Sequence, residues 1–160
     1  MTRRASTTGF TLIELLVTVV IVGLQASIAV PMAELAVQRT RERDLREALR
    51  EIRSGLDAYK QASDEGRLGI DRLASGYPPN LRVLVDGAVD IRSPIKGSRI
   101  YFLRRVPADP FGDPAVPPED TWGKRSYSSP PDSPAEGPDV YDVYSLSTET
   151  GLNSIPFRKW

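Results

Sequence analysis

The sequence has no cysteine and no histidine among its 160 residues. Catalytic arrangements of the Ser-His-Asp and Cys-His types are therefore excluded, and so are nearly all zinc sites, which take Cys or His ligands. Disulfide bonds are excluded too, so any exported part of the chain must fold without them. The 21 basic and 21 acidic residues cancel, and a chain without a basic excess gives no indication of a nucleic-acid partner.

Motifs for phosphate binding and for metal binding fail on inspection. The sequence GKRS at 123–126 is similar to the end of a P-loop, but Pro118 stands where that motif requires its first glycine. A Pro-rich stretch carries several acids without the spacing of an EF-hand, which is typical of a solvated turn. These acids are Asp109, Asp113, Glu119 and Asp120. We expect no catalytic residue, no metal site and no enzymatic activity.

What the sequence does have is one long apolar run, from Phe10 to Val30, that contains a single ionisable side chain, Glu14. As an α-helix this run would span about 31 Å, which matches the hydrocarbon core of a bilayer. A secretory signal peptide would have a shorter apolar region and would not tolerate an acid inside it. The run predicts a transmembrane helix, which we assign to residues 10–37.

Glu14 needs an explanation, because a carboxylate near the centre of a spanning helix costs about 2.5 to 3.5 kcal/mol on insertion scales. In one interpretation it lies about one turn inside the run and reaches back to the headgroups, unpaired and without function. In the other it meets a cation and has a role. Pro31 is equally open: it either kinks the helix or only ends the membrane segment.

The residues around Glu14 carry a recognisable pattern. A short polar leader with Arg3 and Arg4 is followed by Gly9, Phe10 and then Thr-Leu-Ile-Glu-Leu-Leu. This pattern closely resembles the type III signal of type IV pilins and of type II secretion pseudopilins. Gly, Phe, Glu and Pro at these spacings on a spanning helix form a specific combination, whereas any one of them alone would not.

The resemblance implies a processing site and an assembly residue. A prepilin peptidase would remove residues 1–9 by cutting after Gly9 and would methylate Phe10. Glu14 would then be fifth in the mature chain, and Pro31 twenty-second, where many family members also have a proline. The new α-amino group on Phe10 has an ordinary pKa of about 7.7 to 8.0, so in a filament it could pair with Glu14 of a neighbouring subunit.

The charges that flank the run do not settle its orientation. Basic residues occur before it and again soon after it, which leaves the positive-inside rule ambiguous or reversed. Those after it are Arg39, Arg41, Arg43 and Arg46. The resemblance implies a single-pass protein of the bacterial inner membrane, with its N-terminus in the cytoplasm and its C-terminal domain in the periplasm.

Residues 38–160 are enough for one small domain. Apolar residues at helical spacing predict an amphipathic helix over residues 38–65 that covers a core; they are Leu45, Leu49, Ile52, Leu56 and Tyr59. Three ion pairs are expected along this helix, namely Glu42–Arg46, Arg43–Glu47 and Glu47–Arg50. Glycines and prolines end the helix near Gly66. A sheet with loops is expected over 66–160, with strands in 98–107, near Arg125 to Ser128 and in 139–147.

A second resemblance covers the rest of the chain. The GYPPNLRVLVDG stretch and the tail, with DPFGDP, TWGKRSYSSPP, YDVYSLSTETGLN and the final Trp160, look like the major, or G-type, pseudopilin. Better-known members bind calcium after the last strand, through a Gly-Ala-Asp-Gly turn and further aspartates. Here that turn is Ser147 to Gly151, with Glu149 near Asp139, Asp142 and Asn153. The departure disfavours calcium, and we expect no cofactor.

The expected fold is α+β and type IV pilin-like, a ladle in which a long N-terminal helix packs on a small C-terminal antiparallel sheet. The implied function is that of a structural subunit of the type II secretion pseudopilus, a periplasmic filament that drives export of folded proteins. The implied partners are copies of itself, other pseudopilins, the prepilin peptidase and methyltransferase, the secretion assembly platform and the membrane. The alternatives are a type IV pilin or minor pilin for adhesion, motility or DNA uptake, and a domain that merely uses a membrane anchor. The missing C-terminal cysteine pair argues against the pilin, and the Gly9, Phe10, Glu14 pattern argues against the plain anchor.

Overall fold

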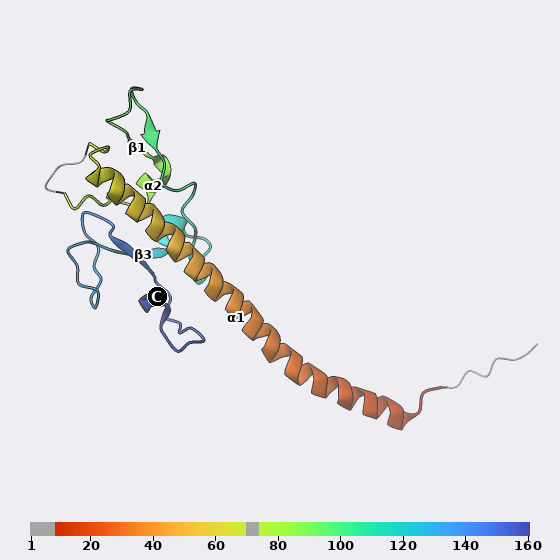
Figure 1. The fold of residues 1–160 in the computed structure, drawn as a ribbon. Coiled ribbons are helices and arrows are strands. Elements are labelled where there is room, and N and C mark those ends of the chain that lie inside the picture. The colour runs from red at the N-terminus through yellow and green to blue at the C-terminus, as the bar shows by residue number, and fades with distance from the viewer. Residues whose placement is uncertain (1–8, 70–73) are drawn as a thin grey trace, which may run out of the picture. The chain divides into compact units, whose positions relative to one another are not determined.

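The computed structural model describes residues 9–69 and 74–160. The predicted leader, apart from Gly9, lies outside the described residues. Residue contacts divide the chain into two units, with the boundary between Thr40 and Arg41. One helix, α1 (Leu12–Asp64), has residues in both units (Figure 1). The remaining elements belong to the second unit.

The described side chains of α1 before Arg41 are exposed, apart from the half-buried Gln38. They include large apolar ones, for example Leu12 at 80% exposure and Leu24 at 64%. Among the described residues, α1 is the one helix long and apolar enough to cross a membrane. The hydroxyls of Thr18 and Ser27 donate to the carbonyls of Leu15 (2.9 Å) and Leu24 (2.7 Å). Both polar groups are therefore satisfied inside the helix, as a lipid environment requires.

The later part of α1 buries one stripe of side chains. Leu45, Leu49, Ile52 and Leu56 are each at most 2% exposed and form the centre of the core. Gly55 allows a close approach on this stripe, because a Cβ there would come within 2.9 Å of the Leu103 side chain. The helix ends in a Schellman motif, in which Gly66 has φ +66° and the Arg67 amide donates to the Ala62 carbonyl.

Two small antiparallel sheets and a short helix cover the stripe. The first sheet pairs β1 (Ala88–Val89) with β2 (Arg99–Ile100), and the second pairs β3 (Trp122–Arg125) with β4 (Asp142–Ser145). The short helix α2 (Arg82–Asp86) buries Leu84, and Figure 1 draws α2 and β3 beside the later part of α1. Trp122, Val143 and Phe157 complete the core, each at most 1% exposed. The α+β class expected of a pilin-like domain is confirmed.

The strands are shorter than the sequence predicts. Strand 98–107 was expected to run through Leu103, but β2 ends at Ile100 because the amides of Phe102 and Leu103 both donate to the Leu84 carbonyl, each at 3.0 Å. The strand expected near Arg125 to Ser128 instead occupies Trp122–Arg125. It ends there because the Ser126 amide donates to Ala135 and the Tyr127 amide to Asp139.

The last strand buries a polar side chain. The buried residues of β4 are Val143 and Ser145, both 0% exposed, whereas Leu146 just after it is 56% exposed. Ser145 can be buried because its hydroxyl donates to Asp109 at 2.5 Å. A hydroxyl with a carboxylate partner therefore occupies a core-facing position of this strand.

Two 3-10 turns complete the elements, η1 (Pro118–Asp120) and η2 (Phe157–Lys159). Between α1 and β1, Arg67 donates to Asp90 at 2.6 Å. The Arg67 hydrogen bond holds the pKa of the Asp90 carboxyl below its usual range. This pair connects the segment that follows α1 to the first sheet.

Candidate assembly site

The N-terminal end of α1 carries the residues that the sequence singles out. Gly9 and Phe10 precede the helix, and Phe10 is 82% exposed. Apart from Gly9 and its chain neighbours, no heavy atom of the described residues lies within 4 Å of the position that a Cβ on Gly9 would occupy. The Gly9–Phe10 junction is therefore accessible and not part of a regular element, as a peptidase would require of its substrate.

Thr11 caps the helix, a role that the sequence reasoning missed. Its Oγ1 accepts the backbone N–H of Glu14 at 3.3 Å, and its carbonyl accepts the N–H of Leu15 at 3.2 Å. Thr11 is thus the N-cap and Glu14 the third helical residue, which is the Thr-x-x-Glu spacing of a capping box. The signal was present in the sequence at residues 11–14.

The cap gives Glu14 a third interpretation besides snorkelling and pairing between subunits. An acid in the first turn interacts favourably with the positive end of the helix dipole, typically by about 0.3 to 1 kcal/mol. Within the described residues, no ion pair of the Glu14 carboxylate is formed. The local gain is smaller than the insertion cost of about 2.5 to 3.5 kcal/mol, so capping alone does not account for the acid.

Pro31 lies inside α1 without ending it. The helix continues from Leu12 to Asp64 as one element. Proline has no N–H, so the carbonyl of Ser27, four residues earlier, has no intrahelical donor from position 31. The continuous helix fits both interpretations of Pro31, so a kink and an end to the membrane segment both stay predictions.

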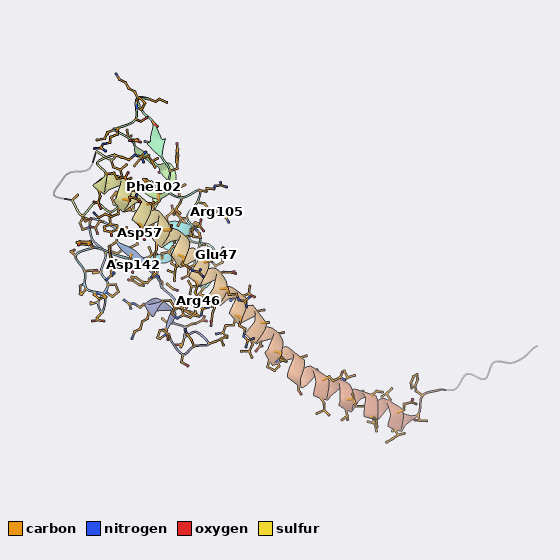
Figure 2. All side chains as sticks on the ribbon, in the orientation of Figure 1. Arg46, Glu47, Asp57, Phe102, Arg105 and Asp142 are labelled. Atoms are coloured by element: carbon orange, nitrogen blue, oxygen red, sulfur yellow. The ribbon has the colours of Figure 1, made fainter. Side chains whose placement is uncertain are left out.

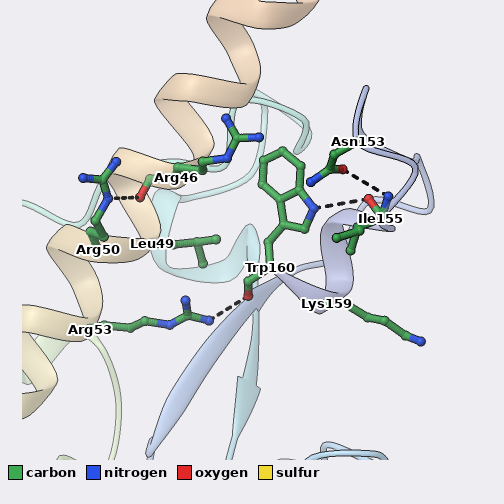
Figure 3. A pocket seen from close by; sticks show the side chains of 8 residues that line it. All are labelled: Arg46, Leu49, Arg50, Arg53, Asn153, Ile155, Lys159 and Trp160. Carbon is green, nitrogen blue, oxygen red and sulfur yellow. Dashed lines mark hydrogen bonds between the residues drawn. The ribbon is translucent and has the colours of Figure 1, made fainter.

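In the second unit a cluster joins the chain's last residues to α1, and the sequence analysis missed most of it. Glu42, 4% exposed, accepts the Leu152 N–H at 2.7 Å and pairs with Arg46 at 3.4 Å. Arg46 lies 4.1 Å from the centre of the Trp160 ring. Arg53 donates to the main-chain oxygen of Trp160 at 2.9 Å (Figure 3).

This cluster contains a buried acid that no apolar pattern indicates. Residues 38–44 include no large apolar side chain, yet Glu42 is buried as the acceptor for the C-terminal loop. Of the three ion pairs expected along the helix, the described residues form only Glu42–Arg46. Glu47 and Arg50 do not pair with each other.

The candidate calcium ligands have protein partners instead of converging on one point. Asp142 accepts from Arg53 at 2.8 Å, and the Asn153 side chain accepts the Ile155 N–H at 3.0 Å. Burial raises the pKa of Asp139, but hydrogen bonds from Ser75, Ser126 and Tyr127 outweigh burial and lower it. In the described part of the chain, no three acidic residues are grouped as metal ligands would be.

The acids of the Pro-rich stretch are also separately engaged. Asp109 accepts the Ser145 hydroxyl and the Phe111 N–H, and Asp113 accepts the Ala115 N–H. Glu119 and Asp120 lie 3.9 Å from Arg82 and 3.3 Å from Lys124. These contacts fit the turn interpretation of the stretch.

Comparison with known proteins finds similarity in both units. The prokaryotic N-terminal methylation motif matches residues 4–30. The chain is 28% identical over 150 residues to the type II secretion system core protein G of Pseudomonas aeruginosa, which covers 92% of this chain and 87% of that protein. No solved structure matches the chain. Along nearly its whole length the chain is thus similar to a G-type pseudopilin of type II secretion, and its N-terminal residues carry the prokaryotic methylation motif.

Proposed function

We propose that this protein is cut between Gly9 and Phe10, methylated on Phe10 and assembled into a periplasmic pseudopilus that drives export of folded proteins. The observation that carries the proposal is the accessible Gly9–Phe10 junction directly before the capped start of α1, where Glu14 is the one ionisable side chain in an apolar run. The methylation motif and the similarity to core protein G support it.

The proposal places residues 10–37 in the inner membrane, with residues 1–9 on the cytoplasmic side and residues 38–160 as the periplasmic domain. In each subunit the Glu14 carboxylate pairs with the Phe10 amine of a neighbouring subunit, since either charge alone is costly in lipid. Pro31 acts as a kink that adapts the helix to its neighbours in the bundle. The subunit is structural and not enzymatic, and it needs no cofactor.

The partners follow from the same proposal. A prepilin peptidase and methyltransferase process the chain, the assembly platform of the secretion system inserts it, and other pseudopilins join the filament. Export then depends on the growth of that filament. In this structural role the chain contributes by packing into the filament and not by catalysing a reaction.

Mass spectrometry of the full chain tests the proposal. Expressed with an active prepilin peptidase, the protein should start at Phe10 and carry one methyl group on its N-terminus; expressed without the peptidase, it should keep Met1. The parent chain should also form filaments that can be sheared from cells and should support secretion of a reporter exoprotein. An uncut chain in peptidase-active cells would contradict the proposal, and cut chains that restore adhesion or motility but not secretion would favour a type IV pilin.

A further inference from the structure

The two flanks of α1 in the second unit carry opposite charge. Arg46, Arg50 and Arg53 follow a spacing of four and three, and Asp44, Glu47 and Glu51 follow a spacing of three and four. Each set therefore lies along one face of the helix. The buried stripe of Leu45, Leu49 and Ile52 separates the two faces where the helix meets the domain.

On the basic flank there is a groove of about 330 Å³. Its cations are the three arginines and Lys159, and Trp160 forms an aromatic wall (Figure 3). Arg46 and Arg53 have acid partners in Glu42 and Asp142. Among the described residues, Arg50 and Lys159 have none, so the groove keeps an excess of positive charge.

On the acidic flank there is a second groove, of about 550 Å³. Asp44, Glu47 and Glu51 line it together with a single cation, Arg105, and an apolar floor that includes Val106 and Pro110. Figure 2 labels Glu47 and Arg105 on one side of α1 and Asp142 on the other. None of the three acids forms an ion pair with another described residue. This groove keeps an excess of negative charge.

We infer that these grooves bind each other between copies of this chain: the basic groove of one subunit receives the acidic flank of the next. The occupant is a second copy because each subunit presents both charges, on separate faces and at the same level of α1. Such a contact is heterologous, and a heterologous contact that does not close on itself generates a helical filament. The inference rests on the proposed filament function and adds the surfaces that set the order of its subunits.

The unpaired side chains support this assignment. An exposed i,i+3 pair between Glu47 and Arg50 would neutralise both flanks locally, and it is not formed. Opposite charges on facing surfaces steer association and exclude wrong registers, while like charges placed opposite each other are strongly disfavoured. The groove surfaces are exposed, so salt should weaken their attraction.

Charge reversal in the full chain tests the inference. Glu47→Arg and Arg50→Glu should each lower the yield of sheared filaments about tenfold, because each places like charges at every subunit contact. The double variant Glu47→Arg/Arg50→Glu should recover most of the parent yield, since the attraction returns with its direction reversed. Lys96→Glu and Glu136→Arg change exposed charges away from both grooves and should assemble normally.

Two outcomes would overturn the inference: single variants that assemble like the parent, or a double variant that assembles no better than the single variants. In both cases the parent's processing and filaments would still support the proposed function, which fails only if the parent itself is not cut or does not assemble. All four side chains are exposed, so melting temperatures should match the parent. If Glu47→Arg or Arg50→Glu lowers the melting temperature, the neutral variant Glu47→Gln or Arg50→Gln is used in its place. Each neutral variant should reduce filament yield less than charge reversal does, and combining the two should not restore the yield.

Cross-linking gives an independent readout, because the chain has no native cysteine. Filaments of Glu47→Cys/Arg50→Cys should give a ladder of dimers, trimers and longer species with an oxidant or a short bis-maleimide. Each single cysteine variant should stay monomeric, and a mixture of the two should stop at dimers. A dimer from a single variant would show an isologous contact instead and would overturn the inference, as would cross-links to another protein only.

Discussion

The two halves of α1 use the same helical geometry for opposite purposes. From Leu12 to Val30 the helix is apolar on most sides and its described side chains are exposed. Its polar side chains there are Glu14 in the capped first turn, Gln25, and the hydroxyls of Thr18 and Ser27, which bond within the helix. After Arg41 it is apolar along one stripe only, and its flanks carry separate rows of cations and acids. A helix that is apolar all round needs lipid or other helices, whereas an amphipathic helix needs a domain to cover.

The two parts of α1 also differ in what stabilises them. Within the second unit, side chains are held by burial against a core that the chain itself supplies. The described side chains of residues 10–37 have no such core, so under the proposed function their packing comes from the bilayer and from other subunits. Changes in the second unit should therefore appear as lost stability of the single chain, and changes near Glu14 as lost assembly.

The largest effect is expected at Glu14. Glu14→Val should insert and be cut normally, because removing the carboxylate relieves about 2 to 3 kcal/mol of insertion cost. Assembly should fail, because the unpaired Phe10 amine of each neighbour would cost about 3 to 5 kcal/mol in a buried contact. Gel shift measures leader removal, and sheared filaments measure assembly.

Glu14→Asp is the matched control, since it keeps the charge with a shorter reach and should retain part of the assembly. Thr11→Ala separates the capping role, which is worth about 1 kcal/mol, from the pairing role. Normal filaments from Glu14→Val would return Glu14 to the snorkelling interpretation. A defect in Thr11→Ala as severe as in Glu14→Val would instead assign the acid to the cap.

The second comparison contrasts two isoleucines on the same helix. Ile52→Ala should lower the free energy of unfolding of the second unit by about 2 to 5 kcal/mol, because Ile52 is fully buried and its loss leaves a cavity. Ile21→Ala should leave that free energy unchanged, since Ile21 lies in the other unit and is 49% exposed. Urea unfolding of the full chain in detergent, followed by Trp122 and Trp160 fluorescence, measures both. Equal losses would mean that the two units do not unfold separately.

The apolar pattern predicted more of the helix than of the sheet, and the reason is physical. Helical spacing depends on local sequence, so the stripe from Leu45 to Tyr59 and the breaker at Gly66 could be read directly. The strands are two to four residues long, and their ends depend on contacts that are distant in sequence. The Leu84 carbonyl accepts the N–H groups of Phe102 and Leu103, which would otherwise be free to extend β2. No local pattern in 98–107 indicates these two hydrogen bonds.

The residues of the candidate site also differ in whether local sequence could predict them. Gly9, Phe10 and Glu14 could be singled out because the signal is contiguous, and Thr11 could have been found from its capping-box spacing. The burial of Glu42 could not, because it depends on Leu152, 110 residues later in the chain. A buried acid between charged neighbours has no local pattern to distinguish it from a solvated one.

A third, smaller effect is expected at this contact. Glu42→Leu should destabilise the second unit by about 1 kcal/mol, because the partly buried hydrogen bond from the Leu152 N–H would lose its acceptor. Glu42→Gln keeps an acceptor oxygen and should cost less. Thermal unfolding of the full chain in detergent measures both, and limited proteolysis should cut Glu42→Leu first within residues 147–156. Equal stability of Glu42→Leu and the parent would mean that this loop holds its place without the contact.

The smallest effect is expected from calcium. In this chain the loop after β4 is held by Glu42 and by its own hydrogen bonds, such as Gly151 N–H to the Ile155 carbonyl at 3.0 Å. Asp142 and Asn153, two of the candidate ligands, are engaged with Arg53 and Ile155. Thermal melts of the full chain with excess chelator or with calcium should therefore coincide within error. A cation at a hundred times its dissociation constant would stabilise the fold by about 2.7 kcal/mol, which raises Tm by several degrees in a domain of this size. Such a rise, abolished by Glu149→Gln but not by Glu136→Gln in the neighbouring loop, would show that a cation holds this loop. Glu42 would then share with that cation the task of fixing the loop to α1.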